Sequence, residues 1–397
     1  MKKSLKDLDV KGKKVLVRVD FNVPMSKEDE NVISDDSRIV AAIPTIKYLI
    51  DQKSKVILMS HMGRPKGQAN PKFSLEVVAK RLSELLNQEV KFIKSDLVVD
   101  EDVKKEVEKL EEGQVALLEN TRFRKEEEKN EEAFAKELAS LADLYVNDAF
   151  GTSHRAHASN VGVSAFLPSA LGLLVEKEVT IMGKALEDPE KPFLAILGGA
   201  KVSDKINVID NLINKVDTIL IGGGMAYTFL KGLGKEIGRS LLEEDKIDLA
   251  LNLLEKAKEN NVEIILPEDV VIADEIDKNA KTEIVDIDHI PVDKEALDIG
   301  PKTREIFSSK IKEAKTVVWN GPMGVFEVEP FSQGTLEVAK ALTESQGVTI
   351  VGGGDSALAI EQAGYKDKIT HVSTGGGASL EFLEGKILPG IDAIEER

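Results

Sequence analysis

Short apolar runs alternate with helical patterns along the whole chain, and this alternation constrains the fold more than any other feature. In the first half, runs that predict buried strands occupy residues 14–19, 56–59, 90–93, 115–118 and 144–146. Helical patterns lie between some of them, as at residues 74–86 and 131–141. Strands that alternate with helices form parallel sheets with helices on both faces. Ligands of such sheets bind beyond the carboxyl ends of the strands.

The second half repeats this pattern after a break. The signals stop around residues 167–172, and residues 173–185 then read as a helix that joins two domains. Apolar runs return at residues 193–197, 218–221, 262–266, 316–319, 349–351 and 369–373. A chain of 397 residues exceeds the size at which a single core stops growing. We therefore expect an α/β fold with two doubly wound, mostly parallel, Rossmann-like sheets, in domains of residues 1–170 and 171–380.

Residues 193–205 combine a strand, a glycine turn and a helix start. The glycine pair 198–199 lets the backbone approach a ligand, and apolar residues recur at helical spacing from Ser203 onward. Lys201 and Lys205 are four residues apart, so we expect them on one face of the first helical turn. Two ammonium groups above a helix N-terminus suit a polyphosphate. The alternative is a surface turn with two solvated lysines. It is not a Walker A loop, because no Gly-Lys pair precedes Ser or Thr.

Polar loops follow four of the first-half strands. Their acidic, amide, imidazole and guanidinium side chains include Asp20, Asn22, His61, Arg64, Arg122 and Arg155. Arg38 stands near an expected helix start. A single arginine is more often a solvated surface group, but several at one sheet edge favour a basin for small oxyanions, which arginine binds bidentately. All three Gly-Gly-Gly triplets lie in the second half. Because glycine turns suit nucleotide phosphates, the two halves are expected to bind different ligands.

Composition excludes several classes of function. The net charge of −17 disfavours DNA, RNA or an anionic membrane as the main partner. The chain has no cysteine, so disulfides, thiolate catalysis and cysteine-based metal sites are excluded. The first residues lack the apolar core of a signal peptide, and no apolar run approaches the ~18 residues of a membrane span. We expect a cytoplasmic protein. His154 and His157 could suggest a metal site, but no carboxylate motif accompanies them.

Residues 352–357 carry a rival motif. Gly-Gly-Gly-Asp-Ser-Ala fits the looser dinucleotide fingerprint G-x-G-x-x-A, and Glu381 follows at a distance that could serve a ribose. The alternative function is therefore a nicotinamide-dependent oxidoreductase. Against it, the motif lies near the end of the second half rather than at the start of a domain. Asp355 would also place a carboxylate beside a pyrophosphate, which makes sense if it holds Mg²⁺.

Eight motifs together closely resemble phosphoglycerate kinase, in order, from about residue 5 to the C-terminus. They lie at residues 18–24 (Arg-Val-Asp-Phe-Asn-Val-Pro), 60–65 (Ser-His-Met-Gly-Arg-Pro), 118–123 (Leu-Glu-Asn-Thr-Arg-Phe), 154–157 (His-Arg-Ala-His), 197–205 (Leu-Gly-Gly-Ala-Lys-Val-Ser-Asp-Lys), 319–327 (Trp-Asn-Gly-Pro-Met-Gly-Val-Phe-Glu), 352–355 (Gly-Gly-Gly-Asp) and 373–377 (Ser-Thr-Gly-Gly-Gly). The resemblance implies a monomeric, two-lobed enzyme with a cleft between the lobes. It also implies that about residues 381–397 return to the N-terminal lobe.

The resemblance further implies a reaction and its ligands. Members transfer a phosphoryl group reversibly between 1,3-bisphosphoglycerate and Mg-ADP, giving 3-phosphoglycerate and ATP, in glycolysis and gluconeogenesis. The glycerate ligand would be bound by Asp20, Phe21, Asn22, Arg38, His61, Met62, Gly63, Arg64, Arg122 and Arg155. The nucleotide would be bound by Gly199, Lys201, Lys205, Gly222, Gly223, Gly224, Gly300, Asn320, Pro322, Glu327, Gly352, Gly353, Gly354, Asp355 and Ser356.

The resemblance implies specific roles for two of these residues, and a third departs from the family pattern. Asp355 looks like the Mg²⁺ ligand, and Glu327 looks like the ribose partner. Ser356 departs from the threonine that is usual in the family, but it keeps the hydroxyl group.

Phosphoryl transfer mainly requires positioning and charge neutralisation, so the lack of a general-base motif is no objection. Our hypothesis is that Lys201 and Arg38 hold the transferring group, one from each lobe, while Lys205 binds the stationary phosphates. Transfer would be in line, in a cleft closed by a hinge near residues 167–178. A third possibility is a non-catalytic phosphate-binding protein or scaffold with the same fold. The intact basic and glycine loops disfavour it.

Overall fold

The computed structural model describes residues 1–29 and 31–397. The chain forms two compact units. Unit 1 contains residues 1–180 and 387–397, and unit 2 contains residues 181–386. Helix α5 (Leu173–Glu187) runs through the sequence boundary between them. The two terminal segments belong to the same unit, where Lys2 and Glu396 form an antiparallel bridge.

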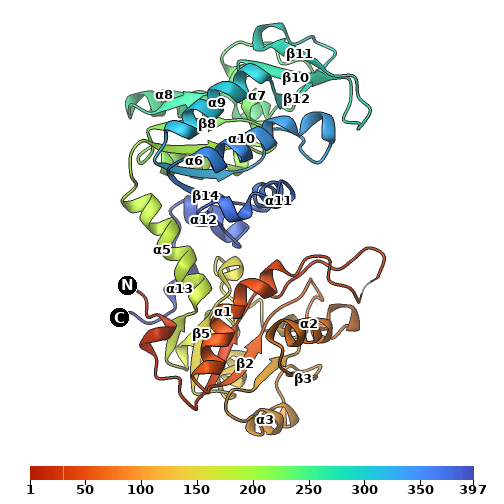
Figure 1. The fold of residues 1–397 in the computed structure, drawn as a ribbon, viewed down its shortest axis with the longest axis vertical. Coiled ribbons are helices and arrows are strands. Elements are labelled where there is room, and N and C mark those ends of the chain that lie inside the picture. The colour runs from red at the N-terminus through yellow and green to blue at the C-terminus, as the bar shows by residue number, and fades with distance from the viewer. Residues whose placement is uncertain (30) are drawn as a thin grey trace. The chain divides into compact units, whose positions relative to one another are not determined.

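Unit 1 contains one six-stranded parallel sheet with the order β3-β4-β2-β1-β5-β6 (Figure 1). Its strands are β1 (Lys14–Arg18), β2 (Lys55–Met59), β3 (Val90–Ile93), β4 (Val115–Leu118), β5 (Leu144–Asn147) and β6 (Ser169–Leu171). The five expected strands of the first half are confirmed to within one residue at each end. Strand β6 was not expected, because three residues are too short to show a period.

The helices of unit 1 complete the layers. They are α1 (Ser37–Asp51), α2 (Glu76–Leu86), α3 (Glu101–Glu108), α4 (Glu132–Ala139) and α13 (Pro389–Asp392), with the short 3-10 helices η1 (Leu5–Asp7), η2 (Pro71–Phe73), η3 (Thr121–Phe123), η4 (Phe150–Thr152) and η5 (Gly162–Ala165). The apolar faces of α1 and α2 contribute Ile46 and Leu82 to one buried cluster with Val17 and Leu58 of the sheet. The charge-rich pattern of residues 124–132 predicts a solvated helix face, and this prediction was wrong. Turns fill this segment, and α4 begins only at its last residue.

Unit 2 contains a second six-stranded parallel sheet with the order β15-β14-β13-β7-β8-β9. Its strands are β7 (Phe193–Leu197), β8 (Thr218–Ile221), β9 (Glu263–Ile265), β13 (Thr316–Asn320), β14 (Val348–Gly352) and β15 (His371–Val372). The expectation of two mainly parallel doubly wound sheets is therefore confirmed. A separate antiparallel sheet, β11-β10-β12, was not expected; its strands are β10 (Asp269–Ala273), β11 (Glu283–Asp286) and β12 (Glu295–Ile299).

Helices cover the parallel sheet of unit 2. They are α6 (Ile206–Leu212), α7 (Met225–Gly232), α8 (Ile247–Glu259), α9 (Pro301–Glu313), α10 (Gln333–Glu344), α11 (Gly354–Gln362) and α12 (Gly377–Leu383), with the 3-10 helices η6 (Val202–Asp204), η7 (Glu244–Lys246), η8 (Ile287–His289), η9 (Glu329–Phe331) and η10 (Lys366–Lys368). On one face, Phe307 of α9 and Leu342 of α10 pack with the buried Trp319 of β13. This cluster fixes the position of β13, which ends at Asn320.

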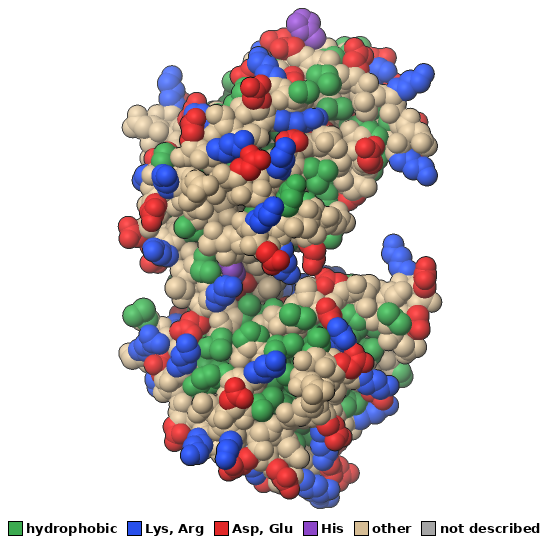
Figure 2. Space-filling model, in the orientation of Figure 1, with side chains coloured by type: hydrophobic (Ala, Val, Ile, Leu, Met, Phe, Trp, Pro, Cys, Tyr) green, Lys and Arg blue, Asp and Glu red, His purple; other side chains and the backbone are tan. Residues whose placement is uncertain are grey.

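The surface carries mixed charge. Figure 2 shows acidic and basic side chains interspersed over the visible face of both units. Among the described residues, no helix combines the length and apolar character needed to cross a membrane.

Candidate functional site

The sheet order of unit 1 brings four polar loops to one edge. Strands β4, β2, β1 and β5 are neighbours, and all of them run parallel. The carboxyl ends of parallel neighbours lie at the same edge of a sheet, so the loops that follow these four strands are adjacent. These loops contain the predicted oxyanion residues of the first half. We call this edge the basic basin; its residues are Asp20, Asn22, Arg38, His61, Arg64, Arg122 and Arg155.

Arg38 and Asn22 connect two of these loops. Arg38, in the first turn of α1, donates from Nη1 to the backbone carbonyl of Asn22 at 2.9 Å. The same nitrogen lies 3.4 Å from Oδ1 of Asp20. The side chain of Asn22 accepts a bond from the backbone N–H of Gly63 at 2.9 Å. Because Arg38 keeps about a third of its side chain exposed, its guanidinium can still reach a ligand.

A second set of bonds fixes the loop that contains His61. Asn120 accepts bonds at Oδ1 from the backbone N–H groups of Met62 and Arg122, at 3.1 and 3.0 Å. Its Nδ2 donates to the carbonyl of Met62 at 2.7 Å. Arg122 donates from Nη1 to the carbonyl of Gly63 at 2.9 Å. Burial lowers the pKa of Arg122 from its usual value, although a guanidinium stays charged at neutral pH. Asn120 was missed as a site residue, although it lies within one of the motifs.

Arg64 and Arg155 present free guanidinium groups. Both residues are exposed, and in the described part of the chain neither side chain makes a hydrogen bond or an ion pair. The backbone of Arg155 is held by Asn160, whose Nδ2 donates to its carbonyl at 2.8 Å. Phe21 and Met62 differ from these arginines, because their side chains pack into the hydrophobic core.

His61 is almost fully buried and has an unexpected neighbour. Its Nδ1 lies 3.1 Å from Nη2 of Arg18, which is the last residue of β1. Burial first, and then the positive charges of Arg18 and Arg122, lower the pKa of His61 well below its usual value. The imidazole is therefore neutral near pH 7. Arg18 was quoted within a motif but not named as a site residue; an arginine inside an apolar strand is the signal that could have identified it.

In unit 2, four glycine-containing turns meet at one sheet edge. Strands β14, β13, β7 and β8 are parallel neighbours, and a turn follows each of them. Gly199 donates its N–H to the carbonyl of Pro322 at 3.0 Å, and Gly223 donates to Met323 at 2.9 Å. We call these four turns the glycine edge; it comprises residues 198–199, 222–224, 320–324 and 352–354.

Gly223 shows why these turns require glycine. Its φ is +69°, and a Cβ there would lie 2.6 Å from the carbonyl oxygen of Gly199. Side chains other than that of glycine rarely tolerate this φ, and no real Cβ approaches a backbone oxygen so closely. The backbones of neighbouring turns therefore come together without intervening side chains.

The two lysines of the glycine edge occupy different environments. Lys201 is exposed, whereas Lys205 is buried and donates from Nζ to Oδ1 of Asn320. Burial lowers the pKa of Lys205 from its usual value. The expectation that both stand on the first turn of one helix was wrong. Lys201 has an extended backbone, η6 follows it, and α6 begins only at Ile206. The reason is Glu243, which accepts bonds from the N–H and the hydroxyl of Ser203 and so holds this segment in a tighter turn.

Asn320, Ser356 and Asp355 complete the glycine edge. Asn320 Nδ2 is buried and has no partner among the described residues. Such a donor costs about 1–3 kcal/mol, which a ligand oxygen could offset. The hydroxyl of Ser356 accepts a bond from the N–H of Gly321 at 2.7 Å, a contact that a threonine hydroxyl could also make. Asp355 is exposed in the first turn of α11.

Gly300 and Glu327 are less closely tied to this edge. Gly300 follows β12 of the antiparallel sheet and precedes α9, and its N–H donates to the carbonyl of Asp269 at 2.9 Å. A Cβ at this position would clash with the Asp269 carboxylate, so packing alone requires glycine there. Glu327 is exposed in the loop that follows β13. Among the described residues, no hydrogen bond joins Gly300 to the four turns of the glycine edge.

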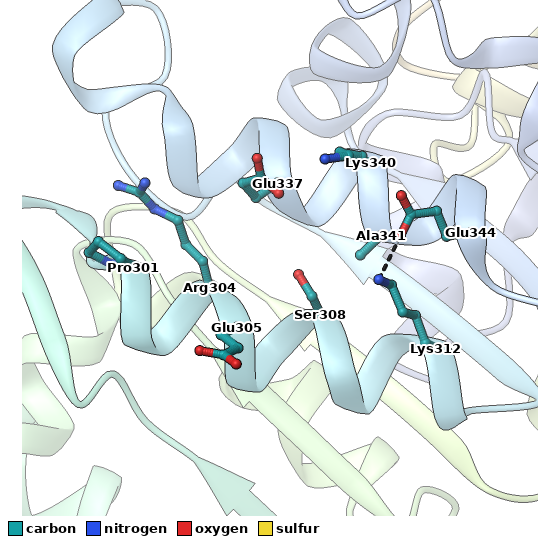
Figure 3. Close-up of a pocket in the computed structure, with 9 residues that line it drawn as sticks. All are labelled: Pro301, Arg304, Glu305, Ser308, Lys312, Glu337, Lys340, Ala341 and Glu344. Carbon is teal, nitrogen blue, oxygen red and sulfur yellow. Dashed lines mark ion pairs between the residues drawn. The ribbon is translucent and has the colours of Figure 1, made fainter.

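A hollow of about 410 Å³ lies between α9 and α10 of unit 2 (Figure 3). It is lined by Pro301, Arg304, Glu305, Ser308, Lys312, Glu337, Lys340, Ala341 and Glu344. Lys312 and Glu344 form an ion pair at 2.6 Å across it. Its cationic and acidic side chains are balanced in number, and none of the predicted site residues lines it.

Comparison with known proteins decides the family. The sequence model described as phosphoglycerate kinase matches residues 5–386. The chain belongs to the phosphoglycerate kinase family. It is 64% identical to a phosphoglycerate kinase of Finegoldia magna over 396 residues, and 60% identical to one of Clostridium botulinum strain Hall over 397 residues. These alignments cover the whole of this chain and 100% and 99% of the relatives.

Solved structures of phosphoglycerate kinases share the fold. The structure from Coxiella burnetii matches with a TM-score of 0.90 and 44% identity, and covers 99% of this chain and 98% of the other. The structure from Pyrococcus horikoshii OT3 matches with a TM-score of 0.82 and 34% identity, with 98% of each chain covered. The predicted family, fold class and enzyme class are therefore confirmed. No finding supports the oxidoreductase alternative at residues 352–357.

The phosphoglycerate kinase site has one candidate for holding a metal. Among the described residues, no group of three or more His, Asp or Glu side chains is placed to bind a metal ion. Mg²⁺ often binds through one or two carboxylates together with substrate phosphates and waters. The single exposed carboxylate of Asp355 fits that pattern. His157 belongs to no such group among the described residues.

Proposed function

We propose that the basic basin of unit 1 binds 3-phosphoglycerate or 1,3-bisphosphoglycerate, and that the glycine edge of unit 2 binds ATP or ADP. Residues 1–170 would form the glycerate-binding domain, with the C-terminal segment from about residue 381 added to it. Residues 171–380 would form the nucleotide-binding domain. The observation that carries the proposal is the convergence of arginines on one parallel sheet edge, because arginine binds small oxyanions such as a phosphate or a carboxylate bidentately.

The neutral His61 suits this ligand. A phosphate and a carboxylate accept hydrogen bonds from cations and from neutral donors alike. The exposed guanidinium groups of Arg64 and Arg155 supply charge, while Asp20 and Asn22 provide acceptors for the glycerate hydroxyl. Phe21, Met62 and Gly63 would hold the loops around the ligand, because their backbone N–H groups donate to Ser60, Asn120 and Asn22.

The nucleotide would bind across the glycine edge. Its phosphates or base would approach the backbones of Gly222, Gly223, Gly224, Gly352, Gly353 and Gly354 closely, because glycine has no side chain. Lys205 and the free Nδ2 of Asn320 would bind the stationary phosphates. Glu327 would bind the ribose, and Gly300, Pro322 and Gly199 would shape the site. Asp355 would hold Mg²⁺, which supplies charge neutralisation when it is bound with the nucleotide, and Ser356 would support the turn.

The chemistry needs no general base. In the direction of ATP use the nucleophile is the carboxylate of 3-phosphoglycerate, which is ionised at neutral pH. In the other direction it is a diphosphate oxygen. The protein must therefore align the two oxygens and neutralise the phosphoryl group between them. We assign that neutralisation to Arg38 of unit 1 and Lys201 of unit 2, so both are catalytic residues in this proposal.

Because the two ligands are assigned to different units, transfer requires that the units close on each other with both ligands bound. Closure would also exclude the water that hydrolyses an acyl phosphate. We place the hinge near residues 167–178 and at the C-terminal segment. X-ray scattering should show a smaller radius of gyration with both ligands than with either alone. An unchanged radius would contradict closure.

A coupled assay separates the possible functions. Purified protein, 3-phosphoglycerate and Mg-ATP should give ADP at a rate proportional to enzyme concentration. A nicotinamide-dependent enzyme would change the nicotinamide absorbance with a different substrate, and a scaffold would give neither signal. We further propose that the protein is a cytoplasmic monomer that acts in glycolysis. Sedimentation velocity would test the oligomeric state.

A further inference from the structure

Arg18 is the most buried cationic side chain beneath the basic basin. Only 1% of the residue is exposed, and it ends an apolar strand, β1. Burial of a guanidinium without partners is very costly, so each of its N–H groups needs an acceptor. Its Nε donates to the hydroxyl of Ser159 at 2.7 Å, and its Nη1 donates to the carbonyl of Val19. The remaining contact, from Nη2, is to Nδ1 of His61 at 3.1 Å.

This last contact determines the protonation of His61. A guanidinium carries only donors and has no acceptor. The ring nitrogen that it meets at hydrogen-bonding distance must therefore offer a lone pair. Nδ1 of His61 is thus without a proton, which excludes both the Nδ1–H tautomer and the doubly protonated imidazolium. The proton of the neutral ring then belongs to Nε2, which is the nitrogen left for a ligand.

Arg18 cannot turn away from the ring, because its own support is buried. Ser159 is fully buried, and its backbone N–H donates to Oε1 of Glu127 at 2.9 Å. Its carbonyl accepts a bond from the Tyr145 hydroxyl at 3.1 Å. Glu127 is also fully buried. Its carboxylate is linked to the Arg18 guanidinium through Ser159. The order from the interior outward is Glu127, Ser159, Arg18 and His61.

The other charged groups that face His61 act in the same direction. Arg18 of β1, Arg122 of η3, Arg38 of α1 and the nearby His157 all lower its pKa, in addition to burial. No acidic group stands among these influences. Charge and hydrogen-bond geometry therefore agree on a neutral ring.

We propose that Arg18, held by Ser159 and Glu127, is a positioning residue that fixes His61 as the neutral Nε2–H tautomer, so that this N–H donates to the anionic glycerate ligand. The tautomer follows from this chain's own contacts, whereas its use by a ligand rests on the function proposed above. Arg18 itself does not touch the ligand in this account.

The tautomer can be measured on the unmodified protein. Long-range proton–nitrogen NMR spectra distinguish the two neutral tautomers and the imidazolium, and the chain has only five histidines. The His61→Gln variant assigns the ring signals by their loss. We expect the Nε2–H pattern for His61, unchanged between pH 6 and pH 8. A Nδ1–H pattern or an imidazolium in that range would overturn the proposal.

A variant tests the consequence for binding. In Arg18→Met the ring is free to change tautomer, so we expect the KM for 3-phosphoglycerate to rise about 10- to 100-fold, as for the loss of one hydrogen bond to a charged group. The KM for Mg-ATP should not change. Arg124→Met is the matched control, because Arg124 pairs with Glu126 and Glu137 outside the basin; its two KM values should stay at the wild-type values.

The outcomes keep the two proposals apart. If Arg18→Met raises both KM values equally, or if its His61 keeps the wild-type tautomer, Arg18 does not act as a positioning residue. If the variant does not fold, the wild-type spectra still decide the tautomer. If wild-type His61 has the expected tautomer but 3-phosphoglycerate leaves its Nε2 shift unchanged, the positioning contact stands and the assigned glycerate site is wrong.

Discussion

Arg38 and Lys201 carry the positive charge that we assign to the transferring phosphoryl group. Arg38 is partly exposed and already anchored to Asn22, and Lys201 is exposed. Both can therefore be truncated without opening a cavity in a core. Their removal should act on the reaction more than on folding.

Arg38→Ala or Lys201→Ala should lower kcat by about 10²- to 10³-fold, because each removes one electrostatic stabiliser of the transition state. Steady-state kinetics with saturating Mg-ATP and 3-phosphoglycerate would measure this. Lys310→Ala is a control for Lys201, since Lys310 pairs with Glu263 on the surface. A kcat close to that of the wild type in either active-site variant would remove that residue from the mechanism.

At the scale of single residues, the sequence predicted most of the charged site residues but not the contacts that hold them in place. Arginine and histidine after expected strands predicted the basin. The role of Arg18 depends on Ser159, which is 141 residues away, and the turn at Lys201 depends on Glu243, which is 40 residues from Ser203. Contacts between residues so distant in the sequence leave no local pattern.

Among the elements, the glycine edge depends on how closely its turns approach one another. Gly223→Ala should raise the KM for Mg-ADP strongly, since its Cβ would push against the Gly199 carbonyl. Gly234→Ala is the matched control. Gly234 also has a positive φ, +82°, but nothing lies within 4 Å of a Cβ added there. The only expected cost of that variant is therefore backbone strain of about 1 kcal/mol. Equal nucleotide KM values for the two variants would contradict the account.

The start of α5 depends on a buried carboxyl group. Asp148 Oδ1 accepts a bond from the N–H of Leu174 at 2.9 Å, and the whole residue is buried. Burial raises the pKa of Asp148 to about 7. The folded state therefore favours the protonated acid, and this contribution to stability is lost as pH rises from about 4 through about 7.

Asp148→Asn keeps the acceptor but removes this titration. Relative to the variant, the wild type should lose up to about 4 kcal/mol of unfolding free energy between pH 4 and pH 8, since one pKa unit corresponds to about 1.4 kcal/mol. Urea unfolding at several pH values would measure the difference. A difference that does not vary with pH would show that the carboxyl group is ionised in the folded state throughout.

Most strands were predictable because buried parallel strands are continuous apolar runs. The antiparallel sheet was not, since its edge strand β11 (Glu283–Asp286) is largely exposed and begins and ends with an acidic residue. Strand β6 was too short, and the charge-rich pattern of residues 124–132 predicted a helix face although most of this segment forms turns.

For the molecule as a whole, we propose that the two compact units bind different ligands. Family membership establishes the kind of enzyme, but not which residues of this chain bind which ligand. Two exposed residues allow a clean comparison: Arg64 of the basic basin and Asp355 of the glycine edge. Neither contributes to a core, so substitution of either should leave the fold intact.

Calorimetric titration of Arg64→Ala and Asp355→Asn with both ligands is the most direct test. Arg64→Ala should weaken 3-phosphoglycerate binding by about 10- to 100-fold, as expected for one lost charge-assisted contact. It should leave the Kd for Mg-ADP within about twofold, because the Arg64 side chain shares no partner with the residues assigned to the nucleotide. Asp355→Asn should show the reverse pattern. If either variant weakens both ligands equally, or if Arg64→Ala weakens only the nucleotide, the assignment of the two ligands to the two units is wrong.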